Sequence, residues 1–378
     1  MSHQWSEIDN LCMDRALECA QRGELHVAPN PLVGCVIVDE DDVVIGSGWH
    51  RAFGESHAEV QAYESLDAKD LPRLDKSTWY VTLEPCNHTG KTPPCSDLIV
   101  RCNPKRIVVA TVDPNPLVSG TGIDRLRSMG LQVDVGCKEA EALWQNRRFI
   151  YAMKHRKPWV VLKWARTADG FLDPRLSEER IPKSGGVSIT GDLAQTLTHQ
   201  WRAEEMGILI GSQTALIDEP LLTARKSAGR DPVRFVIDPE RVIPVDHPLF
   251  ESGASDSRTI RIGSNDVVES VGSNDCVWDP AEGLSALLHQ LHATYGIHSL
   301  LVEGGAHTLN AFIAEGQWNE MKRWTNPQVA GQGLFAPTVP ENAEPIPFGS
   351  NQGIEGDDQW ERWMHARSMI ALSETTSA

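Results

Sequence analysis

The stretch over residues 82–95, which reads TLEPCNHTGKTPPC, constrains the fold of this chain more than any other. Its two cysteines, Cys86 and Cys95, follow a histidine–alanine–glutamate triplet at residues 57–59. Two thiolates and one imidazole supply three ligands of a tetrahedral zinc ion and leave the fourth position for water, which is the pattern of a catalytic zinc site. We therefore expect a fold that brings the histidine and both cysteines together around one metal ion.

Local patterns place these residues at the ends of regular elements. Ser56 is a suitable helix cap, which puts His57 and Glu59 in the first turn of a predicted helix. The positive end of the helix dipole favours a neutral imidazole and an ionised carboxylate, which are the states that a metal ligand and a general base require. Cys86 follows a strand predicted over residues 78–83, and a thiol that leaves a strand and enters a helix is easily ionised.

This set of side chains suits the hydrolytic removal of an amino group from a heterocyclic ring. Zinc lowers the pKa of its bound water towards about 7, and the resulting hydroxide can attack a ring carbon that bears an amino group. Glu59 would take the proton of the water and deliver it to the ring nitrogen and then to the departing ammonia. The zinc deaminases of nucleobases have this pattern of histidine, glutamate and a later Pro-Cys pair with a second cysteine.

Each residue alone has a simpler interpretation. A histidine near a helix start is usually a surface or capping residue, and a single cysteine such as Cys86 is usually a packed thiol. The combination of residues 57–59 with Pro85-Cys86 after a strand favours a catalytic zinc site. A structural zinc ion with four protein ligands would need another residue, for which His88 is the candidate.

Length and charge narrow the class of protein. A chain of 378 residues exceeds one average domain, so we expect two. The net charge of -17 argues against a nucleic-acid backbone as the main partner, although a small phosphorylated substrate needs only local arginines. We find neither a long apolar run nor a secretory signal, so we expect a cytoplasmic protein without a membrane span, whose cysteines are thiols or ligands rather than disulfides.

The first half alternates between helices and strands, which indicates a layered α/β domain. The expected elements are a capped helix from Ser6 to about Gly23 and strands over residues 34–38, 43–46, 106–112 and 131–135. Asn30 lies between two prolines that restrict its backbone. It is either a turn residue or a rigidly held amide that contacts a polar ring.

The spacing of the cysteines separates this chain from most zinc deaminases. Two residues between the cysteines are usual in nucleoside and base deaminases, whereas residues 87–94 lie between Cys86 and Cys95 here. The longer loop resembles the bifunctional deaminase–reductases of riboflavin biosynthesis. The resemblance extends, in the order that this family shows, to Asn30-Pro-Leu-Val-Gly-Cys35, His57-Ala-Glu59, Thr82-Leu-Glu-Pro-Cys86 and Asp113-Pro-Asn-Pro-Leu-Val-Ser-Gly120.

The resemblance implies a three-layer domain like that of cytidine deaminase. It also implies the substrate 2,5-diamino-6-(5-phosphoribosylamino)pyrimidin-4(3H)-one, which would lose its 2-amino group. By position, the base and the ribose phosphate would be contacted by Asn30, His88, Lys91 and Thr92.

The pattern of strands and helices starts again after a basic, proline-ended link over residues 154–158. We place the boundary there, which gives a deaminase domain over 1–155 and a second domain over 156–378. Strands are expected over 159–165, 206–211, 234–238 and 300–303, and helices over 190–204 and 306–314. Repeated strand–helix units indicate a doubly wound sheet with a ligand at the strand ends.

Two features of the second half suit a phosphorylated ligand. Glycines at positions 304 and 305 precede a helix, where a phosphate could approach backbone N–H groups, although a tight turn is the simpler interpretation of a glycine pair. Arg202 and Arg225 could hold a phosphomonoester through their planar donors, although each alone would usually be a surface residue.

The order of motifs in this half resembles the reductase of the same family, which has a dihydrofolate-reductase-like fold and uses NADPH. By position, NADPH would contact Thr214, Asp218, Gly305 and Ala306, and the substrate would contact Lys163, Arg202, Leu222, Arg225 and Glu303. Lys163 could protonate or orient the ribose oxygen. The implied reaction is hydride transfer to the anomeric carbon, which reduces the ribosyl group of the deaminated product to ribityl.

The match is looser here. Val187-Ser-Ile-Thr190 stands where the family commonly has Trp-Ile-Thr. Before Pro220, where the family commonly has two acidic or amide residues, this chain keeps Asp218 and has Glu219 second. The segment after Asn319 carries more charge than the hydrophobic strand expected there. An alternative is therefore a deaminase whose C-terminal half is inactive or altered as a reductase. We expect a small phosphorylated pyrimidine as partner, no nucleic acid, and a homo-oligomer formed through the reductase domain.

Overall fold

A computed structural model describes residues 5–87, 93–115, 119–175, 188–250, 258–264 and 275–373. The chain divides into two compact units, Met1–Lys154 with Leu372–Ala378, and His155–Ala371. This division lies beside the boundary expected between residues 155 and 156, but it groups Leu372–Ala378 with the first unit. In the described ranges, every helix is too short or too polar to cross a membrane.

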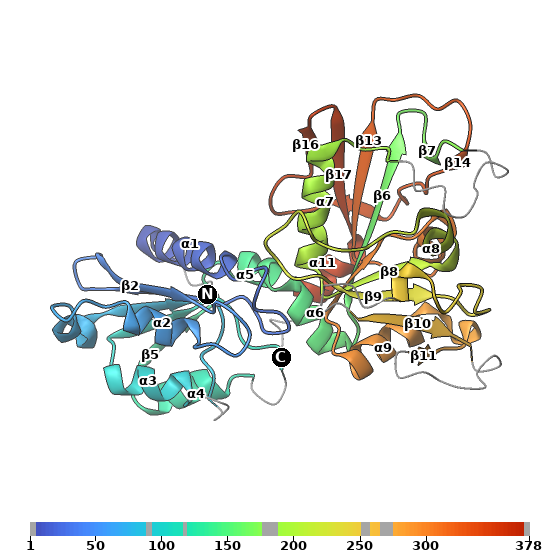
Figure 1. The fold of residues 1–378 in the computed structure, drawn as a ribbon. Coiled ribbons are helices and arrows are strands. Elements are labelled where there is room, and N and C mark those ends of the chain that lie inside the picture. Colours follow the sequence, from blue (N-terminus) through green and yellow to red (C-terminus); the bar gives the residue numbers. More distant parts are fainter. Residues whose placement is uncertain are drawn as a thin grey trace. The chain divides into compact units, whose positions relative to one another are not determined.

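The first unit is built around a five-stranded sheet with the strand order β2-β1-β3-β4-β5 (Figure 1). β1 runs antiparallel to β2 and β3, whereas β3, β4 and β5 are mutually parallel. The strands are β1 (Gly34–Val38), β2 (Val44–Trp49), β3 (Thr78–Val81), β4 (Arg106–Val109) and β5 (Gln132–Val135). The strand expected over residues 34–38 is confirmed in full.

Helices cover both faces of this sheet (Figure 1). Val36 and Val108 pack toward α1, whereas Ile37 and Ile107 pack toward α2, α3 and α4, because successive side chains of a strand point to opposite faces. The helices are α1 (Glu7–Gln21), α2 (Ala58–Glu64), η1 (Leu71–Lys76), α3 (Cys95–Cys102), α4 (Thr121–Ser128), α5 (Glu139–Gln145) and α6 (Arg147–His155). The expected three-layer α/β arrangement is confirmed.

The sequence predicted the first residues of two helices, α1 and α2, and the structure agrees for one of them. Ser6 and Asp9 form the expected capping box of α1. The prediction that Ser56 caps the next helix is wrong, because His57 occupies the N-cap position of α2 and makes no side-chain capping bond. The imidazole of His57 is therefore available for other contacts.

The second unit contains a ten-stranded sheet with the order β11-β10-β9-β8-β12-β6-β13-β17-β15, in which β16 also pairs with β17. The seven strands β11, β10, β9, β8, β12, β6 and β13 are mutually parallel. β17 runs antiparallel to β13, and β15 and β16 each run antiparallel to β17. The strands are β6 (Trp159–Thr167), β8 (Gly207–Gly211), β9 (Val233–Ile237), β10 (Thr259–Gly263), β11 (Asp275–Val277), β12 (Ser299–Val302), β13 (Glu320–Asn326), β15 (Ala343–Pro345), β16 (Gln352–Glu355) and β17 (Asp358–His365). A small separate sheet pairs β7 (Phe171–Asp173) with β14 (Leu334–Phe335).

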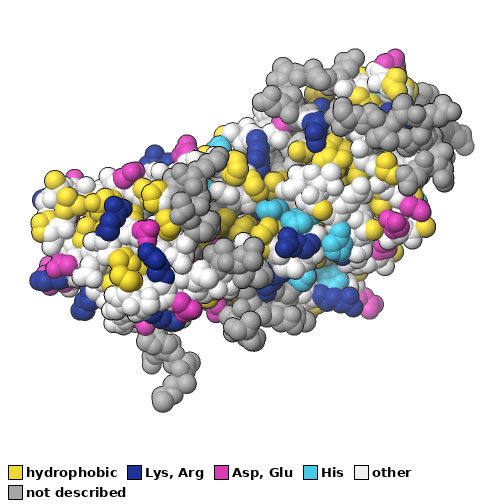
Figure 2. All heavy atoms as spheres, turned by 90° about the horizontal axis from the view of Figure 1, so that it is seen from below, with side chains coloured by type: hydrophobic (Ala, Val, Ile, Leu, Met, Phe, Trp, Pro, Cys, Tyr) yellow, Lys and Arg dark blue, Asp and Glu magenta, His cyan; other side chains and the backbone are white. Residues whose placement is uncertain are grey.

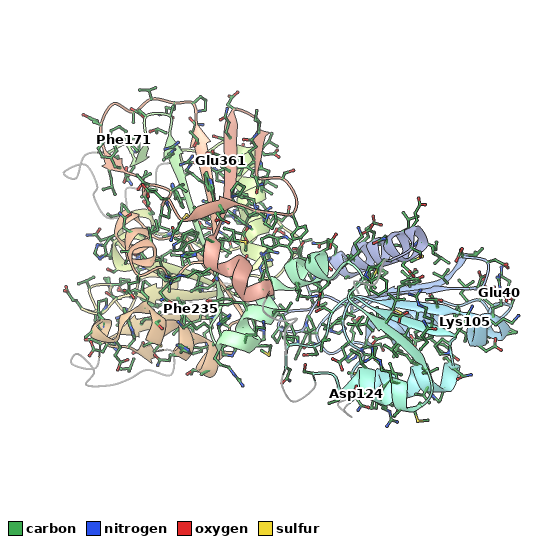
Figure 3. All side chains as sticks on the ribbon, turned by 180° about the vertical axis from the view of Figure 1, so that it is seen from behind. Glu40, Lys105, Asp124, Phe171, Phe235 and Glu361 are labelled. Carbon is green, nitrogen blue, oxygen red and sulfur yellow. The ribbon has the colours of Figure 1, made fainter. Side chains whose placement is uncertain are left out.

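Two cores hold this unit together. The larger core joins the sheet to α9 and α10 and contains Phe235, which Figure 3 labels on β9. The smaller core joins α7 to the other face, where Trp201 stacks on Trp324 with ring centroids 5.3 Å apart. The helices are α7 (Asp192–Glu204), α8 (Ser212–Asp218), η3 (Pro248–Phe250), η5 (Pro280–Glu282), α9 (Gly283–Tyr295), α10 (Ala306–Ala314) and α11 (Ala366–Ser373). The strand–helix units expected of a doubly wound domain are confirmed.

Candidate active sites

His57, Cys86 and Cys95 form a compact cluster in the first unit. Their ligand atoms all lie within 4.8 Å of one another, and no other such group of three occurs in the part of the chain that the structure describes. His57 Nδ1 lies 3.5 Å from Cys86 Sγ and 3.3 Å from Cys95 Sγ. Two thiols and one imidazole nitrogen at this separation fit a tetrahedral zinc ion and leave one position for a fourth ligand.

Three segments converge to make this cluster. His57 begins α2, Cys95 is the first residue of α3, and Cys86 follows β3 in the irregular segment that leaves the sheet. The expectation that Cys86 enters a helix is therefore wrong, and Cys95 is the thiol at a helix start. Glu40 and Lys105, labelled in Figure 3, lie near the opposite end of the same sheet.

Hydrogen bonds from Cys95 and His57 lower the pKa of the Cys86 thiol well below its usual value. The hydrogen bond to Cys86 in turn raises the pKa of His57, and the bond to Cys86 raises that of Cys95. The backbone N–H of Cys95 also donates to Cys86 Sγ at 3.3 Å. The cluster thus already stabilises one thiolate, the form in which cysteine binds zinc.

Glu59 lies beside the cluster and is 3% exposed. Burial, followed by the negative charge of Cys86, raises the pKa of Glu59 to about 7. The helix-dipole argument favoured a fully ionised carboxylate, but burial outweighs it. A carboxyl group with a pKa near neutrality can both accept and release a proton during one reaction.

His50 connects Asn30 to this region. His50 Nδ1 lies 3.2 Å from the Ser56 carbonyl oxygen, which can only accept, so this nitrogen carries the proton. His50 Nε2 then accepts from Asn30 Nδ2 at 3.0 Å, and the Asn30 carbonyl oxygen is directed elsewhere. The His50 and His57 rings lie 5.7 Å apart. Sequence reasoning missed His50, because its partners are set by the tertiary fold and no motif spacing marks it.

His88, Lys91 and Thr92 lie outside the described residues.

A cavity of about 360 Å³ in the second unit gathers most of the residues predicted for the reductase. Its lining includes Lys163, Arg202, Thr214, Asp218, Leu222, Glu303 and Gly305. A neighbouring cavity of about 410 Å³ shares Thr214 and Gly305 and adds Ala306. The exposed Arg225 lines neither cavity and donates from Nη1 to Thr223 Oγ1 at 3.0 Å.

Thr214 and Gly305 join the two cavities. The Gly305 N–H donates to Thr214 Oγ1 at 2.9 Å, which ties the start of α10 to α8. A Cβ atom at Gly304 would lie 2.6 Å from Thr308 Cβ. The packing of α10 is therefore enough to explain a glycine at position 304, without any ligand. Asp218 lies nearby, with its carboxylate 3.3 Å from Arg175 Nη2.

Lys163, Arg202 and Glu303 form a charged group in the cavity of about 360 Å³. Arg202 donates to both carboxylate oxygens of Glu303, at 2.8 Å each, and Lys163 Nζ lies 3.7 Å from one of them. Burial raises the pKa of Glu303, but Arg202 and Lys163 outweigh it and lower that pKa to about 2. Arg202, one of the two arginines predicted to hold a phosphate, is thus paired with Glu303, and its Nη1 donates to the Thr223 carbonyl at 3.1 Å.

Basic and acidic side chains are interspersed on the face shown in Figure 2 rather than gathered into one continuous basic patch. The backbone of a nucleic acid binds to positive faces.

Two family descriptions match separate parts of the chain. "Cytidine and deoxycytidylate deaminase zinc-binding region" matches residues 6–111, and "RibD C-terminal domain" matches residues 158–344. The first region contains His57, Glu59, Cys86 and Cys95.

Several relatives align with this chain over most of both lengths. The riboflavin biosynthesis protein RibD of Aquifex aeolicus is 36% identical over 87% of this chain and 89% of that protein. The RibD of Bacillus amyloliquefaciens is 35% identical over 88% of each chain.

Solved structures agree in fold. A diaminohydroxyphosphoribosylaminopyrimidine deaminase/5-amino-6-(5-phosphoribosylamino)uracil reductase from Thermotoga maritima superposes with a TM-score of 0.80, at 30% identity, over 95% of this chain and 99% of that one. Acinetobacter baumannii RibD superposes with a TM-score of 0.79 over 95% and 99% of the two chains.

Proposed function

This chain belongs to the RibD family of bifunctional deaminase–reductases of riboflavin biosynthesis, and from that premise we propose which of its residues perform each reaction. The resemblance predicted from the sequence is thereby confirmed, as are zinc and NADPH as the cofactors. The reading of the chain as a deaminase alone loses its support, because the reductase family description also matches. The assignment of individual residues below is our proposal.

The zinc cluster and Glu59 support the deamination most strongly. We assign His57, Cys86 and Cys95 as the ligands of zinc, which when bound supplies an acidified water molecule. Glu59 accepts the proton of that water and passes it to the ring nitrogen and then to the leaving ammonia. Its burial beside the cluster fits both transfers.

Substrate orientation in the first unit is assigned to Asn30. Its amide nitrogen is held by His50, so its carbonyl oxygen is the group presented to a ligand. The substrate 2,5-diamino-6-(5-phosphoribosylamino)pyrimidin-4(3H)-one carries several N–H donors that this oxygen could bind. His88, Lys91 and Thr92 remain proposed contacts on sequence grounds alone.

In the second unit, we assign the cavity of about 360 Å³ to the ribosyl group of the deaminated product. NADPH supplies the hydride, and Thr214, Asp218, Gly305 and Ala306 are proposed to hold it. Lys163 orients or protonates the ribose oxygen, and the ionised Glu303 holds the lysine ammonium in place at 3.7 Å. Leu222, Arg202 and Arg225 complete the proposed substrate contacts.

Three further proposals concern partners and location. We propose a homo-oligomer formed through the second unit, a cytoplasmic location, and no nucleic-acid partner. The net charge of -17 and the interspersed charges in Figure 2 support the last of these. Sedimentation of the purified chain would test the oligomer, because a monomer at all concentrations contradicts it.

Incubation of the purified, zinc-loaded chain with the diaminopyrimidine substrate tests the whole proposal. Without NADPH we expect ammonia and the deaminated ribosyl product, and with NADPH we expect its ribityl form with matching NADPH oxidation. Ammonia release without NADPH oxidation would contradict the reductase assignment. NADPH oxidation of supplied intermediate without ammonia release from the substrate would contradict the deaminase assignment.

A further inference from the structure

Glu84 is a buried carboxylate held by backbone N–H groups. Its side chain is 5% exposed. Oε2 accepts from the N–H groups of Asp113 and Gly120 at 3.1 and 2.9 Å. Oε1 accepts from those of Gly122 and Ile123 at 2.8 and 3.4 Å. One side chain shortly after β3 therefore binds Asp113, Gly120 and the first turn of α4.

The charge of Glu84 is balanced by backbone groups. Within the described residues, it forms no ion pair with lysine or arginine. Gly120 is the N-cap of α4, so Gly122 and Ile123 belong to the positive end of that helix. An acidic group at this point is strongly oriented, because both of its oxygens are held by donors that cannot rotate away.

The same helix start packs directly against the segment that bears Cys86. A Cβ atom at Gly122 would lie 2.0 Å from the Pro85 carbonyl oxygen, so the absence of a side chain permits this approach. Asn87, on the other side of Cys86, donates to the Thr121 carbonyl at 3.3 Å. The metal-binding cysteine is thus flanked on both sides by residues that contact the start of α4.

The second cysteine is linked to this arrangement by its neighbour. Ser96 Oγ donates to Asn87 Oδ1 at 3.1 Å, and the Ser96 N–H donates to the Cys86 carbonyl at 3.1 Å. Ser96 immediately follows Cys95 in α3. Displacement of the segment between Glu84 and Asn87 would therefore change the position of Cys86 relative to both other ligands.

We propose that Glu84 is a positioning residue for deamination: by binding the N–H groups of Asp113, Gly120 and the first turn of α4, it holds Cys86 at its place in the metal cluster. This inference rests on the proposed function. Glu84 does not contact the cluster in the structure and acts through the backbone of Pro85 and Cys86. Residues that orient metal ligands in this way typically affect metal affinity or activity by about 10- to 100-fold.

Substitution by glutamine changes the charge and the acceptor atoms of Glu84 but keeps the size of its side chain. Glutamine has one acceptor oxygen, so its NH₂ group would face two backbone N–H donors. Aspartate keeps both oxygens but is one methylene shorter. Asp124 provides a matched control, because it is also acidic, lies in the first turn of α4 and is exposed (Figure 3).

The experiment compares wild type, Glu84→Gln, Glu84→Asp and Asp124→Asn as full-length chains. Cobalt(II) replaces zinc so that the thiolate-to-cobalt absorption reports the geometry of the cysteine ligands, and hydrogen exchange is measured at the Gly120 and Gly122 amides. For Glu84→Gln we expect a shifted cobalt spectrum, faster exchange and a deamination kcat lowered about 10- to 100-fold, with reductase activity on supplied intermediate unchanged. Glu84→Asp should lie between it and wild type, and Asp124→Asn should match wild type.

A Glu84→Gln chain with the wild-type cobalt spectrum and deamination kcat would overturn the proposal, as would equal loss of both activities. If Glu84→Gln does not fold, Glu84→Asp decides by the same criteria. Wild type that does not deaminate would contradict the proposed function instead, and the cobalt spectrum and the amide exchange would still test the role of Glu84.

Discussion

Two features of the surroundings of Glu59 raise the pKa of its carboxyl group. It is almost fully buried, and the thiolate of Cys86 adds a negative charge nearby. Both raise the pKa of Glu59 to about 7, whereas His57 acts against them. A group in this range loses little driving force in either direction of proton transfer at neutral pH.

Replacement of Glu59 by glutamine tests this role. We expect Glu59→Gln to bind zinc as wild type does, because none of the proposed ligand atoms changes, and to lower the deamination kcat about 1,000-fold. Zinc content by elemental analysis and ammonia release provide the two measurements. Glu55→Gln, at an exposed position near the same helix, is the control. Normal deamination by Glu59→Gln would show that another group moves the proton.

His199 gives a pH prediction for the second unit. Burial, followed by the charges of Arg202 and Arg225, lowers the pKa of His199 to about 4. The unfolded chain should bind a proton at about pH 6.5, so between these values it binds more protons than the folded chain. The contribution of neutral His199 to stability is therefore complete above about pH 6.5 and is lost as the pH falls toward 4.

We expect His199→Gln to reduce the fall in Tm between pH 6.5 and 4.5, because glutamine keeps a donor for its surroundings but does not titrate. His289→Gln is the matched control, since His289 lies exposed on α9. Thermal unfolding across this pH range measures both variants. Parallel Tm curves for wild type and His199→Gln would contradict the assignment.

The three members of the His57–Cys86–Cys95 cluster were predictable from sequence, whereas the residues that support them were not. The sequence marks them by a His-Ala-Glu triplet followed by a Pro-Cys pair and a second cysteine. His50 and Glu84 act through backbone groups, namely the Ser56 carbonyl and the N–H groups after β4. Any residue type can supply such groups, so no sequence pattern records these contacts.

At the scale of elements, β13 shows how a strand can be both central and charged. The segment was expected to be more hydrophobic, yet Glu320 and Lys322 are buried within it. Glu320 accepts from Arg362 on the adjacent β17 at 2.9 Å, and Lys322 lies 3.2 Å from Glu204 on α7. The charges are tolerated because partners on neighbouring elements pair with them, and a partner distant in sequence cannot be read from the strand alone.

The pairing of β13 with β17 leads to a prediction with an internal control. Glu320 has no exposed side-chain surface, so Arg362→Met should remove an ion pair of a buried carboxylate and cost about 3 kcal/mol of unfolding free energy. Arg323 pairs with Glu361 on the same two strands, but the Glu361 side chain is 36% exposed. Arg323→Met should therefore cost below about 1 kcal/mol. Denaturant unfolding measures both, and equal costs would contradict the argument from burial.

Regular elements with a strong local pattern were predicted with good boundaries. The strand over residues 34–38 is a continuous apolar run, and the helix over 306–314 begins after two glycines and is also confirmed. The predicted start of α2 was one residue too early. Ser56 has the side chain of a typical N-cap residue, but His57 occupies the N-cap position. Capping preference is a weak signal where a functional side chain takes the cap site.

At the scale of the whole molecule, each unit has the requirements for independent activity. The first unit has cores on both faces of its own sheet, and the second has two cores of its own. The proposed catalytic residues of each reaction lie within a single unit. A substitution in one site should therefore leave the other reaction within about two-fold of wild type, as expected for sites without shared contacts.

Complementation between two full-length variants tests this independence. Glu59→Gln should retain reduction of supplied 5-amino-6-(5-phosphoribosylamino)uracil but lose deamination, and Lys163→Met should do the reverse. Neither proposed reaction leaves the intermediate covalently attached, so it can leave one chain and bind another. We therefore expect an equal mixture of the variants to oxidise NADPH in the presence of the diaminopyrimidine substrate, while each variant alone does not. If both half-reactions are intact but the mixture is silent, the intermediate does not pass through solution, and the two sites must be coupled within one assembly.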